Sequence, residues 1–476
     1  MHRRLVLAAA TIVLAAPSAL AEPTAPPNRT AAALGLAPIQ ATVPPMPDSP
    51  LEVKIQTIQP LRLEDAIAIG LERSPQLELA RLTAERAEAT VLQAQAGLFP
   101  TVSLTTGYTY NQSATSKITA ALLAQSSAGG LGSAVAQVET APFNTQISIN
   151  WTIFSSGQVG SRIEAAAESL RSTRLGLERT RQDLLQNIVT AYYNLQTADG
   201  NVEIGEASVR SGEASLKDAQ AQERAGVGTR FAVLQAQVQL ANARQTLLSY
   251  QNQRIVAQRD LARLLNFPTP TDVTAADSIE KGNGWQASLE ESILLAYRNR
   301  VELEQSLAQE RAARATEATY YATTAPQVSV FLSGQTYDNL LDTVRGIYSG
   351  YSAGAQIQWQ IFDGGAAAAQ AAQSVADAKT ARINYIDTRN AIRYAVENAY
   401  ASMLTASLQI DTATEAASEA EESLRLARLR FQAGVGTQLE VINADRDLAQ
   451  ARINRLTAVI DYNKALTSLR RATGTL

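Results

Sequence analysis

The stretch Ala225-Gly226-Val227-Gly228-Thr229 decides the fold, because it returns 208 residues later as Ala433-Gly434-Val435-Gly436-Thr437. The same offset joins Trp151 to Trp359 and holds from about residue 151 to residue 266. Upstream, an offset of 226 joins Pro100 to Pro326, so the first copy carries 18 extra residues between 103 and 146. A repeat of this length is too long for a solenoid unit. It indicates a duplicated half-protein with internal pseudo-symmetry.

Both copies carry the apolar pattern of long packed helices. Prolines are absent from 143–267 and from 327–476, as uninterrupted helices require. Within 184–219 and 392–427, 22 apolar or glycine positions follow alternating steps of four and three, the 3.5-residue period of a coiled-coil seam. The seam is rich in Ala and Gly, which favours a curved wall of closely spaced helices. Helices are expected at 158–225 (roughly 100 Å at ~1.5 Å per residue), 230–266, 438–471, 61–98 and 288–322.

Short stretches of a different period lie between the opening helices and the long ones. Residues 146–153 and 355–361 alternate strictly between Ile or Trp and Gln, Asn, Ser or Thr. With looser partners, the pattern predicts strands near 101–110, 144–154, 327–337 and 351–362. Each is about 10 residues long, the length of a tilted transmembrane β-strand. A soluble hairpin packed on a core is the alternative. The uncharged polar faces and the lack of any segment to cover the apolar faces favour the membrane.

Four strands cannot close a barrel, and an open sheet edge cannot lie in lipid. Two chains would pool 8 strands around a narrow, filled interior, whereas three would pool 12 and leave room for a pore. The sequence therefore predicts an oligomer.

The N-terminus predicts export. A basic start, an apolar core and the sequence Ala19-Leu20-Ala21 make residues 1–21 a signal peptide. The chain has no cysteine, so we expect neither disulfides nor a lipid anchor on the mature protein. Its only histidine, His2, lies in the signal peptide, which leaves no histidine- or cysteine-based catalytic triad or metal site. We expect no enzyme activity and no cofactor, although paired carboxylates could in principle hydrolyse a substrate.

Composition also bounds the partners and the organisation of the chain. The mature net charge is near −6, which argues against a nucleic-acid partner. The carboxylate-rich runs 302–310 and 415–422 are interpreted as solvated helix faces. The predicted segments are a signal peptide at 1–21, a Pro-rich extension at 22–60, a first repeat at 61–266, a linker at 267–286 and a second repeat at 287–476.

From about 61 to 476, these residues resemble the TolC-like outer-membrane factor family. The resemblance rests on Phe99-Pro100 before a strand, on Phe362-Asp363-Gly364-Gly365 after one, and on the repeated Ala-Gly-Val-Gly-Thr turn followed by Val-Leu-x-Ala (233–236) or Val-Ile-x-Ala (441–444). It implies a mainly helical homotrimer with a 12-stranded outer-membrane barrel continuous with a periplasmic α-barrel. It also implies the exit duct of a tripartite efflux pump or type I secretion system, with a periplasmic adaptor and an inner-membrane transporter as partners.

The resemblance implies site residues as well. It places adaptor contact at the periplasmic tip, on Gly226, Val227, Gly228 and Thr229 and on Gly434, Val435, Gly436 and Thr437. A family acid three residues after the turn matches Glu440, where the first copy has Ala232, and a second family acid falls on Asn443. We therefore expect Glu440 and Asn443 at a pore constriction. The glycines and threonines also have a purely local use, since they close one helix and cap the next.

Two choices stay open at this stage. Trp151 and Trp359 are either membrane-interface anchors or packing residues. The chain itself is either a channel or an exported coiled-coil stalk or adhesin whose strands form a head. The residues between 111 and 143, which hold the 18 extra positions, predict a long external loop.

Overall fold

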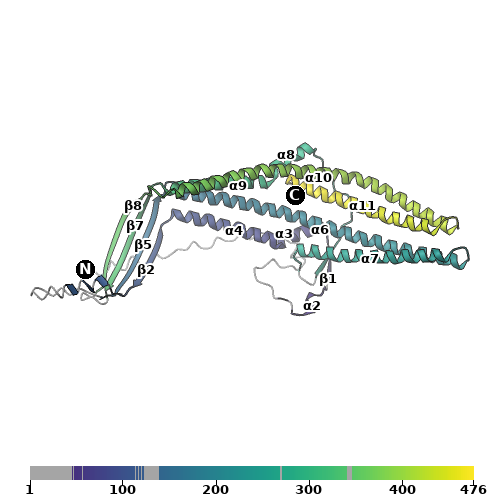
Figure 1. Ribbon diagram of the computed structural model, residues 1–476, viewed down its shortest axis with the longest axis horizontal. Coiled ribbons are helices and arrows are strands. Elements are labelled where there is room, and N and C mark those ends of the chain that lie inside the picture. Colours follow the sequence, from purple (N-terminus) through teal and green to yellow (C-terminus); the bar gives the residue numbers. More distant parts are fainter. Residues whose placement is uncertain are drawn as a thin grey trace, which may run out of the picture.

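The structure is a computed structural model that describes residues 46, 48–55, 57–112, 114–115, 117–118, 121–122, 139–267, 271–339 and 346–476. The predicted signal peptide lies outside these residues, as do most of the predicted extension and most of the predicted 111–143 loop. The described part is elongated, with a sheet at one end and two helical turns at the other (Figure 1). None of its helices combines the length and the apolar character needed to cross a membrane.

The sheet is antiparallel, and each copy contributes two of its four strands (Figure 1). The order is β2, β5, β7, β8, so the pairing of β5 with β7 joins the two copies. Among the described residues, the edge strands β2 and β8 each pair on one side only. The strands are β2 Thr101–Tyr108, β5 Pro142–Phe154, β7 Gln327–Asn339 and β8 Tyr348–Gln358.

The strand register separates a polar face from an apolar face. One row across the four strands consists of four serines, with hydroxyls 2.7 Å apart in the first pair and 2.8 Å apart in the second: Ser103, Ser148, Ser333 and Ser352. The next row, on the opposite face, is apolar: Val102, Ile149, Leu332 and Ala353. This confirms the predicted division into an uncharged polar face and an apolar face.

The fourth strand ends earlier than predicted. Instead of reaching residue 362, β8 stops at Gln358, so Trp359 lies beyond it. The partner strand β7 sets this limit. It begins at Gln327, directly after Pro326, and Gln327 pairs with Gln358, so β8 has no partner residue beyond that point. In the first copy, Asn111–Gln112 (β3) and Glu139–Thr140 (β4) add a short antiparallel pair that the sequence did not predict.

The first helices of the two long hairpins match residue for residue. Helix α6 spans Gln158–Arg224 and α10 spans Ala366–Gln432, 67 residues each, and both bounds differ by 208. The returning helices are α7 (Arg230–Leu264) and α11 (Gln438–Thr473). At the start of α10, the Asp363 carboxylate accepts hydrogen bonds from the N–H groups of Gly365 and Ala367 at 2.8 and 2.7 Å. The Asp363 side chain thus caps the start of α10.

The opening helices are broken, whereas the sequence predicted one continuous helix in each copy. In the first copy α3 (Leu63–Arg73) gives way to α4 (Pro75–Gln95), because the residue before a proline disfavours the helical conformation. In the second copy α8 (Leu289–Asn299) gives way to α9 (Val301–Thr323) at Arg300, which is extended without a proline.

The Arg300 guanidinium bonds both carboxylate oxygens of Glu302 at 2.8 Å. Arg471 of α11 bonds the same carboxylate at 2.7 Å. The prediction that the run 302–310 is solvated is therefore wrong for Glu302, which is buried.

The helices lie side by side in a fixed order. Along one flank of α6, Figure 1 shows α4 and α3 followed by α7, end to end. On the other flank α6 contacts α9 and α11, which also contact α10. The resulting order is α4/α7, α6, α9/α11, α10.

The predicted coiled-coil seam forms the core of this layer. None of its 22 positions is exposed, and Ile188, Leu195 and Val396 are wholly inaccessible. The small seam residues let the helix backbones approach closely. A Cβ added to Gly212 would lie 3.5 Å from the Cα of Leu240, which is ordinary contact distance. Burying one Ile or Leu side chain contributes about 1.5–3 kcal/mol, so the larger seam residues stabilise the layer.

The segments on either side of the first repeat pair with each other. Strand β1 (Thr57–Leu61) runs parallel to β6 (Thr271–Ala275), which joins the end of the predicted Pro-rich extension to the predicted linker. The Tyr192 hydroxyl of α6 fixes this pair by donating to the Leu61 carbonyl at 3.0 Å and lies 2.9 Å from a carboxylate oxygen of Asp277. A small structured unit thus sits at mid-length of the helical layer.

Candidate functional site at the helical tips

The two glycine turns have the same geometry. Gly226 and Gly434 both have φ +75°, a left-handed conformation that ordinary residues adopt at a cost. The next two N–H groups bond one carbonyl of the preceding helix, that of Gln222 in the first copy, at 3.0 and 2.9 Å. A Cβ on Gly228 would lie 2.9 Å from backbone atoms of that helix, and one on Gly436 would lie 3.0 Å away. Close approach of the backbone therefore requires glycine at these positions.

Threonine starts the returning helix at both turns. The Thr229 hydroxyl accepts from the N–H of Ala232 at 3.2 Å, and the Thr437 hydroxyl accepts from the N–H of Glu440 at 3.3 Å. These are ordinary N-caps, so the predicted local use of both residues is confirmed.

The turns present apolar side chains at one end of the molecule. Val227 is 78 % exposed and Val435 is 70 % exposed, and Figure 1 shows the two turns at the same end. Phe231 and Leu439, one helical turn further on, are exposed as well. The structure therefore brings the eight predicted contact residues to one tip, where the side chains of Val227 and Val435 are exposed to solvent.

The two predicted constriction residues lie just behind the second turn. Glu440 is in the first turn of α11, and its carboxylate lies 3.8 Å from the Arg430 guanidinium. Asn443 is exposed, one turn further along. The first copy offers Ala232 at the position of Glu440, so this carboxylate belongs to one hairpin only.

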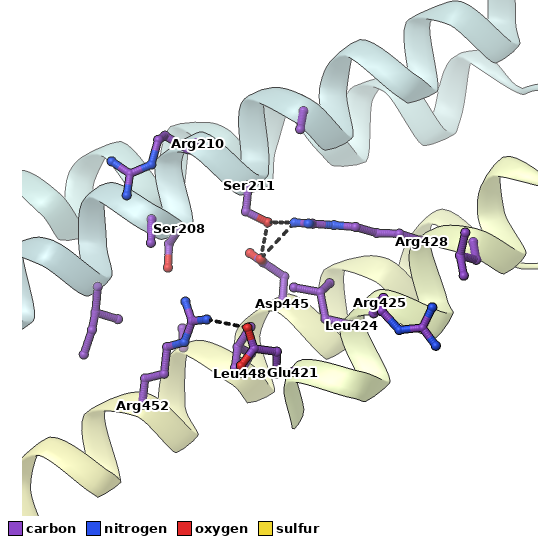
Figure 2. A pocket seen from close by; sticks show the side chains of 15 residues that line it. Ser208, Arg210, Ser211, Glu421, Leu424, Arg425, Arg428, Asp445, Leu448 and Arg452 are labelled. Carbon is purple, nitrogen blue, oxygen red and sulfur yellow. Dashed lines mark hydrogen bonds and ion pairs between the residues drawn. The ribbon is translucent and has the colours of Figure 1, made fainter. Parts of the chain in front are cut away.

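A polar cluster ties the two hairpins together behind the tip, and sequence reasoning missed it. Ser211 of α6 donates its hydroxyl to the Asp445 carboxylate of α11, and Arg428 of α10 donates to the same hydroxyl (Figure 2). Arg428 also lies 3.9 Å from Asp445. The only signal in the sequence was a difference between the copies, since Asp445 corresponds to Gln237.

Asp445 is the one acid of this cluster, and its side chain is mostly buried. Its side chain is 12 % exposed. Burial raises the pKa of its carboxyl above the usual range, against the opposing effects of the Ser211 hydroxyl and of the Arg428 and Arg452 charges. Further hydrogen bonds cross between the hairpins nearer the tip, from the Gln438 amide to Ser215 at 2.7 Å and from the Gln222 amide to the Phe431 carbonyl at 2.7 Å.

The cluster borders a cavity of about 590 Å³ between α6, α10 and α11 (Figure 2). On its far side Arg452 pairs with Glu421 at 3.3 Å. The first copy repeats this ion pair 208 residues earlier, between Arg244 and Glu213 at 2.9 Å. The two hairpins thus share their internal ion pair but differ in the acid that faces the neighbouring helix.

Trp151 and Trp359 lie where the strands meet the helices. The Trp151 indole N–H donates to the Leu98 carbonyl at 2.9 Å, and that of Trp359 donates to the Thr324 carbonyl at 3.0 Å. Each indole therefore closes the end of the preceding helical segment, while its ring remains largely exposed. Exposed Phe154 and Phe362 stand near them in sequence.

Solved structures resemble this fold. The outer membrane protein VceC of Vibrio cholerae is 19 % identical, covers 87 % of this chain and 96 % of its own, and superimposes with a TM-score of 0.71. The MtrE outer membrane channel of Neisseria gonorrhoeae, in its open state, is 20 % identical, covers 87 % and 89 %, and has a TM-score of 0.72. These likenesses concern the fold.

Sequence comparison identifies relatives. Nodulation protein T of Rhizobium leguminosarum bv. viciae is 23 % identical over 323 residues, which are 66 % of this chain and 66 % of that protein. The chain thus covers just under two thirds of that relative. The family model for outer membrane efflux proteins matches residues 67–266 and 293–475, one segment in each copy and together well over half of the chain. The chain therefore belongs to the outer membrane efflux protein family.

Proposed function

We propose that three copies of this chain close into one tube and form the outer-membrane exit duct of a tripartite efflux pump or type I secretion system. Cargo would pass through it without catalysis, from a periplasmic adaptor and an inner-membrane transporter to the exterior. The observation that carries this proposal is the sheet. In the part of the chain that the structure describes, it has one uncharged polar face, one apolar face and two open edges, and it stands at one end of hairpins roughly 100 Å long.

A sheet of this kind has a specific physical requirement. Open backbone edges are unstable in lipid, so the sheet must be closed by further strands. Three copies supply 12 strands, which close with the serine row facing a water-filled interior and the valine and isoleucine row facing lipid. The exposed rings of Trp151 and Trp359, at the end of the sheet, then lie at the membrane–water interface.

In this arrangement the helical tips are the periplasmic entrance. The exposed Val227 and Val435 offer the adaptor two apolar contacts on rigid turns. Glu440 and Asn443 line the closed constriction, and the Ser211–Asp445 contact holds neighbouring hairpins together until the adaptor separates them. Residues 1–21 direct export, and the absence of cysteine leaves the mature protein without a lipid anchor.

The test is extraction and conductance. Purified from outer membranes in detergent, the protein should have the mass of a trimer and should conduct ions in planar bilayers. Glu440→Ala should raise conductance and weaken block by divalent cations. Glu422→Ala, which removes an exposed acid of α10 that pairs with Arg425 at 2.6 Å, should leave both unchanged. A trimer that never conducts would favour the coiled-coil stalk instead, and unaltered conductance and cation block in Glu440→Ala would remove Glu440 from the constriction.

A further inference from the structure

The sheet is almost free of charge. Its four strands hold one charged residue, Asp338, although charged residues make up 18 % of the chain. Asp338 pairs with Phe143, and strand alternation places it on the apolar face with Leu332. The opposite face of the described strands, which carries the serine row, therefore has no charged side chain. We call it the polar face.

The polar face offers hydrogen bonds in place of charge. Its polar side chains are all those of Ser, Thr, Asn, Gln or Tyr, and the row after the serines pairs Gln146 with Gln335. Each of these groups can both donate and accept a hydrogen bond. Such a surface suits neutral polar molecules, because it meets their donors and their acceptors without attracting an ion of either sign.

Two tyrosines lie at the end of this face that is farthest from the helices. Strand β7 follows α9 and β8 leads to α10, so their far ends carry Tyr337 and Tyr348 (Figure 1). Tyr337 pairs with Asn144 on one side and with Tyr348 on the other. Each of the three lies four positions from a serine of the serine row, so alternation places them on the polar face. We call Asn144, Tyr337 and Tyr348 the tyrosine row.

The tyrosine rings are accessible, unlike the third aromatic ring of the polar face. Tyr337 is 46 % exposed and Tyr348 is 55 % exposed. Phe331 pairs with Gly354, and a Cβ added to Gly354 would lie 2.9 Å from the Phe331 ring. That ring therefore lies over the glycine backbone and forms part of the wall. The rings of Tyr337 and Tyr348 are the ones left to meet a passing molecule.

We propose that the tyrosine row is a binding subsite for a neutral oligosaccharide that passes along the duct. The inference rests on the proposed tube, in which the polar face lines the interior, and it adds the chemical class of the cargo. A sugar ring has C–H groups on its faces and hydroxyls around its edge. Tyr337 and Tyr348 present apolar rings with a polar tip, and the Asn144 amide both donates to hydroxyls and accepts from them.

Other classes of cargo fit this face less well. A nucleic acid or another polyanion is bound through basic side chains, and a metal cation is bound through carboxylates or imidazoles. The described part of the polar face has none of these groups. An apolar molecule gains by burying apolar surface, but most side chains here carry a hydroxyl or an amide. A neutral chain of hydroxyl-bearing rings matches the whole set.

Closure of the tube repeats the subsite. Each chain supplies two tyrosines, so three copies place the tyrosine row three times around one level of the barrel. An oligosaccharide held by one row is at high effective concentration for the next. Weak contacts at single rings therefore add to a measurable hold without stopping passage.

Block of the ion current by a sugar tests the subsite. In planar bilayers, maltohexaose should interrupt the current through the full-length protein as its concentration rises, and polyethylene glycol of equal mass should not. Tyr337→Ala with Tyr348→Ala should raise the half-blocking concentration about tenfold, as the loss of ordinary aromatic contacts implies. Tyr337→Phe with Tyr348→Phe keeps both rings and should retain most of the block.

Tyr351→Ala is the matched control on β8. Tyr351 is 87 % exposed and lies one position from Ser352 of the serine row, which places it on the apolar face. Its removal should leave the block by maltohexaose unchanged.

The outcomes separate the subsite from the duct. A conducting protein that maltohexaose never blocks, or that polyethylene glycol blocks equally well, would overturn the subsite alone. An unchanged half-blocking concentration in the double alanine variant would remove the tyrosine row from it. Stronger block by an anionic hexagalacturonate would overturn the neutral class of cargo. A protein that never conducts would overturn the proposed duct itself.

Discussion

Replacing Glu302 by Gln should destabilise the protein by about 3 kcal/mol, at the lower end of the range for breaking a buried ion pair. The Glu302 side chain is 8 % exposed and accepts from Arg300 at 2.8 Å and from Arg471 at 2.7 Å. Glutamine keeps the shape but removes the charge between two buried guanidiniums. The loss stays near the lower end because Arg471 retains Asp183, at 2.7 Å.

The same carboxyl predicts how the loss depends on pH. Burial alone would raise the pKa of Glu302, but the hydrogen bonds and charges of Arg471 and Arg300 outweigh it and lower the pKa below its usual value. A group whose pKa is lowered on folding stabilises the protein above its unfolded pKa, about 4.3 for Glu, and loses this contribution as the pH falls through the folded value. The gap between wild type and Glu302→Gln should therefore shrink in acid.

Denaturant unfolding of the purified protein in detergent, followed by circular dichroism, measures both effects. Glu304→Gln is the matched control on the same helix, because its carboxylate is 36 % exposed and its pairing with Arg171 and Arg311 is worth less than about 1 kcal/mol. Equal losses for the two substitutions, or a gap that does not change between neutral and acidic pH, would refute the reasoning.

Three further predictions concern the tip and the middle of the helical layer. Gly228→Ala should destabilise the first hairpin by about 1–3 kcal/mol, because the added Cβ would meet the backbone of the preceding helix. Gly160→Ala has open space around the added Cβ and should stabilise α6 by about 0.5–1 kcal/mol. Thermal unfolding of the two variants measures both changes. Tyr192→Phe should cost about 1–3 kcal/mol in the same assay, since it leaves the part-buried Asp277 N–H without the hydroxyl that accepts from it. Because the pKa of Asp445 is raised on folding, its contribution to stability is full below the ordinary Asp value and is lost as the pH rises through the folded one. Wild type should therefore gain stability over Asp445→Asn on acidification, which thermal unfolding at neutral and acidic pH measures.

The parts of the fold that could be predicted from the sequence are those fixed by local chemistry. The ends of α6 and α10 follow from turn residues that act within four positions, such as Asp363 on the N–H of Ala367. The break before Pro75 was equally readable, since it needs only the residue before a proline. The break at Arg300 was not, because the Glu302 that stabilises it is fixed by Arg471, 169 residues away from Glu302.

The same distinction between local and long-range contacts applies to the candidate site. The glycine turns and their threonine caps could be predicted, because each hydrogen bond there spans six residues or fewer. The Ser211–Asp445 contact could not, since its partners are 234 residues apart and the repeat offset of 208 does not pair them. Equivalence between copies indicates which residues occupy the same place, but contacts between copies need the three-dimensional order of the helices.

That order gives the repeat its functional meaning. The copies agree at helix bounds, turns and the internal ion pairs Glu213–Arg244 and Glu421–Arg452, which is what a wall of uniform radius requires. They differ at the contact between the hairpins, where Asp445 is nearly buried and its counterpart in the first copy is the neutral Gln237. A carboxylate that is desolvated when two helices close together resists that closing when it is ionised. The contact between the two hairpins of one chain should therefore weaken as the pH rises through the folded pKa of Asp445, which burial raises.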